Sequence, residues 1–170
     1  MTKCEFNTQL VLHQSMLKRY AHYFTNSSED ANDLVQETTL KAMLYHDRFR
    51  NGTNLKGWLY TLMRNIFINQ YRRNARSGMV GSSEVDLGNG SMALQWACEN
   101  GGDHRCMKKD IVKALSDLQC EHRHPFNLFY FGFKYHEIAE QLQIPIGTVK
   151  TRIHLARKQM KLALAGYRHD

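Results

Sequence analysis

Apolar side chains recur at intervals of three and four residues along most of this chain, and no stretch alternates apolar with polar residues. Near the N-terminus this spacing is followed by Leu10, Leu17, Ala21 and Phe24. Such a period places apolar side chains on one face of an α-helix. Only two of the 170 residues are proline, so few helices have to end early. The pattern predicts an all-α fold.

Charge and glycine content divide the chain into three pieces. Residues 1–76 and 106–170 each carry 11 basic and 6 acidic side chains, whereas residues 77–105 carry one basic and four acidic side chains and six of the eleven glycines. The middle piece has no helical period and too little apolar surface to become ordered by itself. We therefore expect two small helical domains, 1–76 and 106–170, joined by a flexible linker over 77–105.

The overall charge favours a polyanionic partner. Lys and Arg outnumber Asp and Glu by 23 to 16, which suits nucleic acid or an acidic membrane surface. No stretch approaches the ~20 apolar residues that span a membrane, and the N-terminus leads into no signal-peptide core. The four cysteines form no disulfide-framework pattern. A reducing, cytoplasmic location is the expectation.

Three helices are expected in the N-terminal piece, and the second begins at Ser27, where Asp30 completes a capping box. The side chains expected to face inward on this helix are Leu34, Val35, Thr38, Ala42 and Met43. Those expected to face outward include Asp33, Gln36 and Glu37. A polar loop follows from His46 to Asn54, in which Gly52 can adopt a positive φ.

The third helix is expected to bury Leu55, Leu59, Leu62 and Ile66. Its opposite face carries Asn65, Asn69, Arg72, Arg73 and Arg76. Amides followed by cations suit a nucleic-acid strand. A solvated basic face is the commoner explanation of such a run when it is considered alone, because net charge argues for partners only weakly.

In the C-terminal piece, the first helix is expected to bury Met107, Ile111, Ala114, Leu115 and Leu118. His124-Pro125 is expected to end it, because the residue before a proline is pushed out of the helical region. Gly132 is a plausible stop for the aromatic segment that follows.

The segment EIAEQLQIPIGTVKTRIHLAR, residues 137–157, contains two short amphipathic runs around a turn. The second run is expected to bury Val149, Ile153, Ala156 and Met160 and to expose Lys150, Thr151, His154, Lys158 and Lys161, with Arg152 and Arg157 at the margins. This pattern predicts a helix-turn-helix whose second helix enters the major groove of DNA with its N-terminus first. Its first turn, with Lys150 and Thr151, is placed for base edges, and Lys158 is placed for phosphates.

Three segments occur in the order ANDLVQETTLKAM, DRFRNGTNLKGWLYTLMRNIFINQYRR and YHEIAEQLQIPIGTVKTRIHLARKQM. They resemble regions 2.2, 2.3–2.4 and 4.2 of the bacterial extracytoplasmic-function sigma factors of the sigma-70 family. The resemblance implies two helical domains, a function in promoter recognition and transcription initiation, and no catalysis or cofactor. It implies as partners the core RNA polymerase (β′ clamp and β flap), promoter DNA and an anti-sigma factor that can hold the protein at the membrane.

The same resemblance implies residue roles. The residues that it places at the polymerase are Asp33, Gln36 and Glu37. Those that it places at the −10 element are Phe49, Arg50, Asn51 and Thr53 around a flipped base, with Asn65, Asn69, Arg72 and Arg73 along the melted strand. Those at the −35 element are Lys150, Thr151, Arg152, His154 and Lys158.

Three positions depart from the family pattern. Gln143 replaces a usual glycine in the turn, where a positive φ costs a non-glycine residue on the order of 1 kcal/mol. Lys134 replaces a serine that would cap the short helix, and Leu155 replaces a cation that some relatives direct to DNA. These departures concern −35 specificity rather than the class of protein.

Two other functions remain as alternatives. A conventional helix-turn-helix regulator that binds duplex operator DNA would explain the C-terminal motif but not the two N-terminal ones. A metal-dependent enzyme would need ligands from Cys98, His104 and Cys106, or from Cys120, His122 and His124. Neither spacing matches a common zinc pattern, so we expect no metal site.

Overall fold

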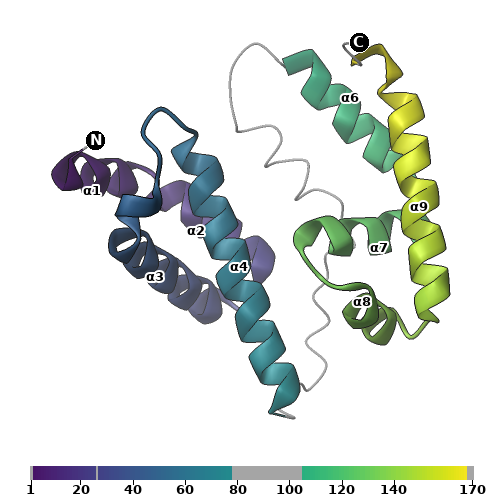
Figure 1. Cartoon of the computed structure of the whole chain (residues 1–170), viewed down its shortest axis with the longest axis horizontal. Coiled ribbons are helices and arrows are strands. Elements are labelled where there is room, and N and C mark those ends of the chain that lie inside the picture. The colour runs from purple at the N-terminus through teal and green to yellow at the C-terminus, as the bar shows by residue number, and fades with distance from the viewer. Residues whose placement is uncertain (1, 26, 78–104, 168–170) are drawn as a thin grey trace. The chain divides into compact units, whose positions relative to one another are not determined.

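A computed structural model describes residues 2–25, 27–77 and 105–167, with side chains from residue 109 onward in the last segment. The chain divides into two compact units, unit 1 (Met1–Val85) and unit 2 (Asp86–Asp170). Every regular element among the described residues is a helix (Figure 1), which confirms the predicted all-α class. The predicted linker lies, except for its two end residues, outside the described residues.

Unit 1 is a three-helix bundle with a fourth helix against it. Its elements are α1 (Lys3–Leu12), α2 (Gln14–Phe24), α3 (Ser28–Leu44), a 3₁₀ turn η1 (His46–Arg48) and α4 (Leu55–Arg76). Helices α2, α3 and α4 pack on one another in pairs and bury Leu17, Leu34 and Leu59 completely. The Ser27 hydroxyl accepts hydrogen bonds from the backbone N–H groups of Glu29 and Asp30, which confirms Ser27 as the cap of α3.

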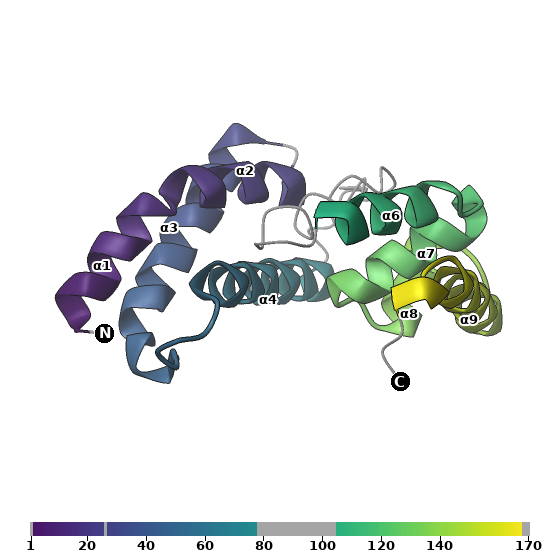
Figure 2. The same ribbon diagram turned by 90° about the horizontal axis from the view of Figure 1, so that it is seen from above.

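The predicted first helix is two helices, α1 and α2, with His13 between them. The His13 N–H is shared between the carbonyls of Gln9 and Leu10, as is usual in a last turn. The break lets α1 run at an angle to α2 (Figure 2). As a result, Phe6 is 1% exposed and packs on the rings of Phe49 and Trp58, a contact that the helical stripe did not predict.

Unit 2 contains α6 (Arg105–Ser116), α7 (Cys120–Phe131), α8 (Tyr135–Leu142), α9 (Ile146–Ala163) and a 3₁₀ turn η2 (Ala165–Tyr167). Helices α6, α7 and α8 all pack on α9. One buried cluster is formed by Leu115, Leu118, Phe126 and Ala156. Among the described residues, one side of α9 is exposed, with Lys150, Thr151, His154 and Lys158 on it.

The predicted helix end at His124-Pro125 is wrong, because α7 runs through Pro125 and the break lies at residues 117–119. Pro125 is the sixth residue of α7, where it cannot donate to the Glu121 carbonyl and crowds that carbonyl with its ring. Pro125 is buried, as is the adjacent Phe126, and this apolar burial contributes against the cost of the missing bond. Gly132 does end the helix, with φ at 110° and the Phe133 N–H donated back to Leu128, as in a Schellman cap.

Candidate nucleic-acid interface

The loop between α3 and α4 is held by its own backbone and by a cluster of rings. Gly52 has φ at 83°, as predicted, and the Thr53 hydroxyl donates to the Arg50 carbonyl at 2.7 Å. At the end of the loop, the Asn54 side chain accepts from the Gly57 N–H at 3.1 Å and caps α4. These hydrogen bonds hold the loop in this conformation without a ligand.

Four loop residues were predicted to surround a flipped base, and the structure separates them into two groups. Arg50, Asn51 and Thr53 are exposed. Phe49 is only 9% exposed, with its ring centroid 5.6 Å from that of Trp58. The ring of Phe49 is turned inward, so in this conformation it supports the loop instead of offering a face to a base.

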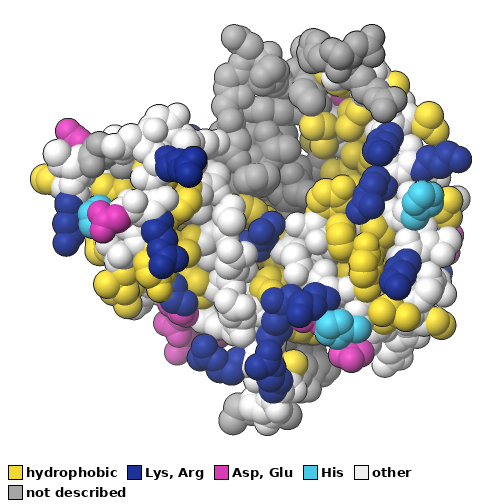
Figure 3. Space-filling view, in the orientation of Figure 1, with side chains coloured by type: hydrophobic (Ala, Val, Ile, Leu, Met, Phe, Trp, Pro, Cys, Tyr) yellow, Lys and Arg dark blue, Asp and Glu magenta, His cyan; other side chains and the backbone are white. Residues whose placement is uncertain are grey.

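The exposed side of α4 carries amides and then cations. Asn65, Asn69 and Arg73 are exposed at successive four-residue steps, and Arg72 beside them is half-buried. Lys and Arg side chains gather toward the C-terminal end of α4 (Figure 3). Amide and cationic donors thus follow one face of α4, an arrangement suited to single-stranded nucleic acid.

The outward face of α3 has two parts, which together we call the α3 surface. Its first part consists of Asp33, Gln36 and Glu37, of which the first two are exposed. The Glu37 carboxylate accepts a hydrogen bond from Gln70 of α4 at 2.5 Å and pairs with Lys41 at 2.7 Å. Glu37 therefore also joins α3 to α4.

The second part of the α3 surface is apolar. Leu40, Met43 and Leu44 are 58%, 38% and 65% exposed. The prediction that Met43 faces inward is wrong, because Met43 is turned ~100° away from the buried Ala42 beside it. Sequence reasoning missed this patch, although the spacing of Leu40 and Leu44 from Asp33 and Gln36 places all four on one helix face.

In unit 2, the predicted helix-turn-helix is formed by α8 and α9. Gln143 closes α8 with φ at 52°, so the turn has the left-handed geometry that was expected. Lys134 precedes α8 and has no acceptor for a cap, as expected, but its own N–H donates to the Glu137 carboxylate at 2.7 Å. The backbone-to-Glu137 hydrogen bond of a capping box is therefore present, whereas the side-chain cap is not.

Helix α9 buries Val149, Ile153 and Ala156 and turns its predicted DNA-binding side chains outward. Those that are exposed are Lys150, Thr151, His154 and Lys158. Arg152 differs, because it is half-buried and pairs with Glu121 of α7 at 3.2 Å. Contact between Arg152 and DNA would require it to leave this pair.

Within the described part of the chain, no three His, Cys, Asp or Glu side chains lie close enough to hold a metal ion; Cys98, His104 and the side chain of Cys106 fall outside it. Within the same residues, no helix is both long enough and apolar enough to cross a membrane.

Two family models match the chain in the order of its units. Sigma-70 region 2 matches residues 10–77, and Sigma-70, region 4 matches residues 108–160. The ECF RNA polymerase sigma factor EcfG of Rhodopseudomonas palustris is 32% identical over 149 residues, which are 87% of this chain and 78% of that protein. The chain belongs to the extracytoplasmic-function sigma factors.

Other sigma factors are similarly related to it. The ECF RNA polymerase sigma factor SigL of Mycobacterium tuberculosis is 34% identical over 156 residues, covering 89% of this chain and 84% of that protein. The solved structure of the sigma factor RpoE in complex with the anti-sigma factor NepR from Bartonella quintana is 28% identical, covers 96% of this chain and 99% of that one, and has a TM-score of 0.42. Because this sigma factor matches region 2 as well as region 4, a conventional helix-turn-helix regulator is not favoured.

Proposed function

We propose that this sigma factor directs core RNA polymerase to promoters through three separate surfaces: the α3 surface for polymerase, the loop and exposed face of α4 for the −10 element, and α9 for the −35 element. The observation that carries the proposal is the division of α9 into a buried apolar stripe and an exposed row of Lys150, Thr151, His154 and Lys158. The row begins at Lys150, the fifth residue of α9, and presents donors suited to base edges and phosphates on the side of the helix opposite the buried stripe.

For the −10 element, we assign Arg50, Asn51 and Thr53 to a flipped base and Asn65, Asn69 and Arg73 to the melted strand. Removing a base from the stack costs a few kcal/mol. Contacts of the loop with that base, and of arginine side chains with the DNA backbone, offset this cost. Phe49 supports the loop from below, and the half-buried Arg72 is assigned to the strand backbone. Promoter opening of this kind requires no covalent chemistry, so we assign no catalytic residue.

For polymerase, the α3 surface combines a polar part with an apolar part. Asp33 carries a negative charge on an otherwise basic unit and is therefore unsuited to phosphate, but suited to a basic protein partner. The exposed Leu40 and Leu44 supply the apolar contact area that a protein interface requires. This combination favours a protein partner over DNA on α3.

The experiment that tests the docking assignment uses Asp33→Arg, because Asp33 is exposed and, unlike Glu37, does not join α3 to α4. We expect this variant to lose co-purification with core polymerase and to keep its thermal unfolding transition. Glu140→Arg, an equal charge change at an exposed position of α8, should leave co-purification unchanged. Normal polymerase binding by the Asp33 variant would place the docking surface elsewhere.

Regulation by an anti-sigma factor remains a prediction from the family resemblance, and a cytoplasmic location remains a prediction from the cysteine pattern and the lack of a signal-peptide core. Co-expression with a candidate anti-sigma factor would test the regulation, with loss of promoter activity as the expected result. Fractionation of cells that express the chain would test the location.

A further inference from the structure

Two aromatic rings lie against one flank of α9. Phe129 stands near the end of α7, and Tyr135 is the first residue of α8. Their ring centroids are 5.1 Å apart with planes inclined by 17°, a stacked pair. We call these two residues the aromatic platform.

The turn between α7 and α8 fixes the platform. Gly132, at φ 110°, reverses the chain, and the Phe133 N–H donated to the Leu128 carbonyl closes that reversal. Phe133 is 2% exposed and anchors the turn in the core. The reversal returns the chain so that Tyr135 stacks on Phe129, six residues earlier, and both rings stay half-buried.

Each ring of the platform faces a cation from α9. The Lys150 Nζ lies 5.9 Å from the centroid of the Tyr135 ring, and the Arg157 Cζ lies 5.5 Å from that of Phe129. Both distances fall within the range of cation–π attraction. Seven residues of helix separate positions 150 and 157 by about 10 Å along the axis, so the platform receives cations from positions two turns apart on α9.

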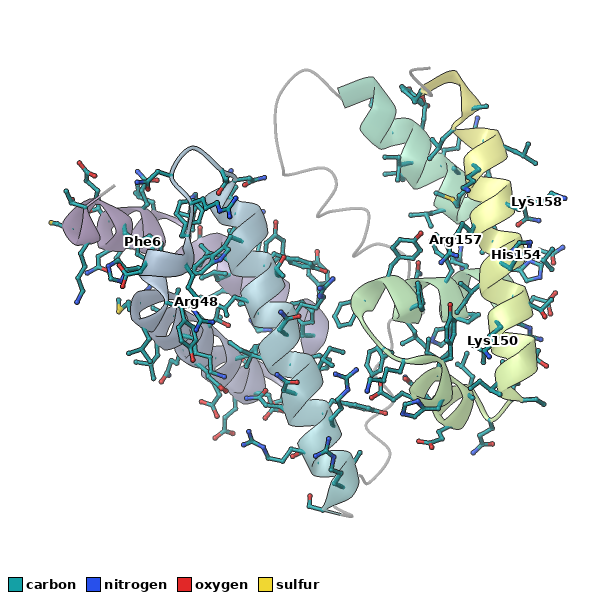
Figure 4. The ribbon with its side chains drawn as sticks, viewed as in Figure 1. Phe6, Arg48, Lys150, His154, Arg157 and Lys158 are labelled. Carbon is teal, nitrogen blue, oxygen red and sulfur yellow. The ribbon has the colours of Figure 1, made fainter. Side chains whose placement is uncertain are left out.

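The side chains of α9 therefore differ in the contacts that they make with the rest of unit 2. Arg157 points toward α7, whereas His154 and Lys158 point away from the other helices of unit 2 (Figure 4). On the opposite flank, Arg152 is held by Glu121. Lys150 stands at the edge of the exposed row, held by a ring that leaves Nζ hydrogens on its outer side available to an acceptor.

We propose that Tyr135 is a positioning residue that sets −35 specificity by holding Lys150 in one direction at the edge of the groove, with Phe129 keeping the Tyr135 ring in place. This rests on the proposed role of Lys150 in reading a −35 base. A lysine has a flexible four-carbon stem, and a lysine whose ammonium group already lies over a ring has less freedom to lose when it binds. The platform thus turns a mobile cation into a directed donor.

The test uses the complete holoenzyme and a promoter library with a randomised −35 element. Tyr135→Leu removes the π face and keeps apolar bulk, and we expect a two- to fivefold loss of preference at the one base position that Lys150 reads. Tyr135→Phe keeps the ring and should keep the preference. His136→Ala, at the neighbouring exposed position, should leave it unchanged, and the −10 preference should remain normal in all three variants.

A double-mutant cycle with Lys150→Ala separates the two assignments. If Lys150→Ala leaves every −35 preference intact, the base-reading role of Lys150 is wrong and the positioning role falls with it. If Lys150→Ala relaxes one position but Tyr135→Leu does not, only the positioning role is overturned. The proposal requires that Tyr135→Leu have no further effect on −35 preference when Lys150 is already alanine. If Tyr135→Leu has the same effect in the Lys150→Ala background as in the wild type, the positioning role is also overturned.

Discussion

Lys150 and Lys158 lie on the same exposed row of α9, yet we expect their replacement by alanine to have different consequences. Eight residues of helix separate them by about 12 Å, more than three base-pair steps of ~3.4 Å. Residues near the N-terminus of such a helix contact base edges, and Lys150 is the fifth residue of α9 whereas Lys158 is the thirteenth. Lys150→Ala should therefore cost about 1–3 kcal/mol at one −35 position, or roughly 5- to 150-fold in affinity.

Lys158→Ala should instead weaken all sequences alike. Loss of one phosphate contact lowers the slope of log K against log salt by about 0.9. Over a fourfold change in salt concentration, that corresponds to about a 3.5-fold smaller change in affinity. Lys113→Ala, at an exposed position on α6, serves as the matched lysine control.

The assay is holoenzyme binding to promoters with each −35 base substituted, measured at several salt concentrations. Equal, sequence-independent losses for Lys150→Ala and Lys158→Ala would refute the reasoning, because they would reduce α9 to a general cationic face.

Two other predictions concern stability. Gln143→Gly should stabilise unit 2 by about 0.5–1 kcal/mol. It relieves ~1–2 kcal/mol of left-handed backbone strain, which exceeds the ~0.5–1 kcal/mol cost of ordering a glycine, and it removes no packing because the Gln143 side chain is exposed. A lower melting temperature would contradict this. Burial raises the pKa of Tyr60 to about 12, against the lowering effect of Arg64. Because the folded state disfavours the phenolate, the contribution of Tyr60 to the free energy of unfolding is complete below its ordinary pKa of ~10 and is lost as pH rises toward 12. The stability of Tyr60→Phe should therefore depend less on pH above ~10 than that of the wild type. An unchanged dependence would contradict this prediction.

Local sequence signals predicted the features that single residues determine. Ser27 predicted a helix start because its hydroxyl can cap, and Gly132 predicted a helix end because glycine tolerates positive φ. The stripe of Val149, Ile153 and Ala156 predicted which side of α9 is buried. Each of these depends on short-range geometry that the sequence encodes directly.

Features that depend on distant partners could not be predicted in this way. Phe49 is buried because α1 brings Phe6 against it, and Arg152 is held because α7 brings Glu121 near it. Pro125 is tolerated within α7 because its ring packs in a core. For Phe49 and Arg152, a segment far along the chain decides the role of the side chain.

The most direct test of the account is transcription with bacterial core RNA polymerase on a promoter library randomised at the −10 and −35 elements, with and without this sigma factor. The account predicts that transcripts appear only when the sigma factor is added and that the active promoters share both elements. It further predicts that Lys150→Ala relaxes the −35 element and leaves the −10 element unchanged. Binding to duplex DNA without any sigma-dependent transcript would contradict the account.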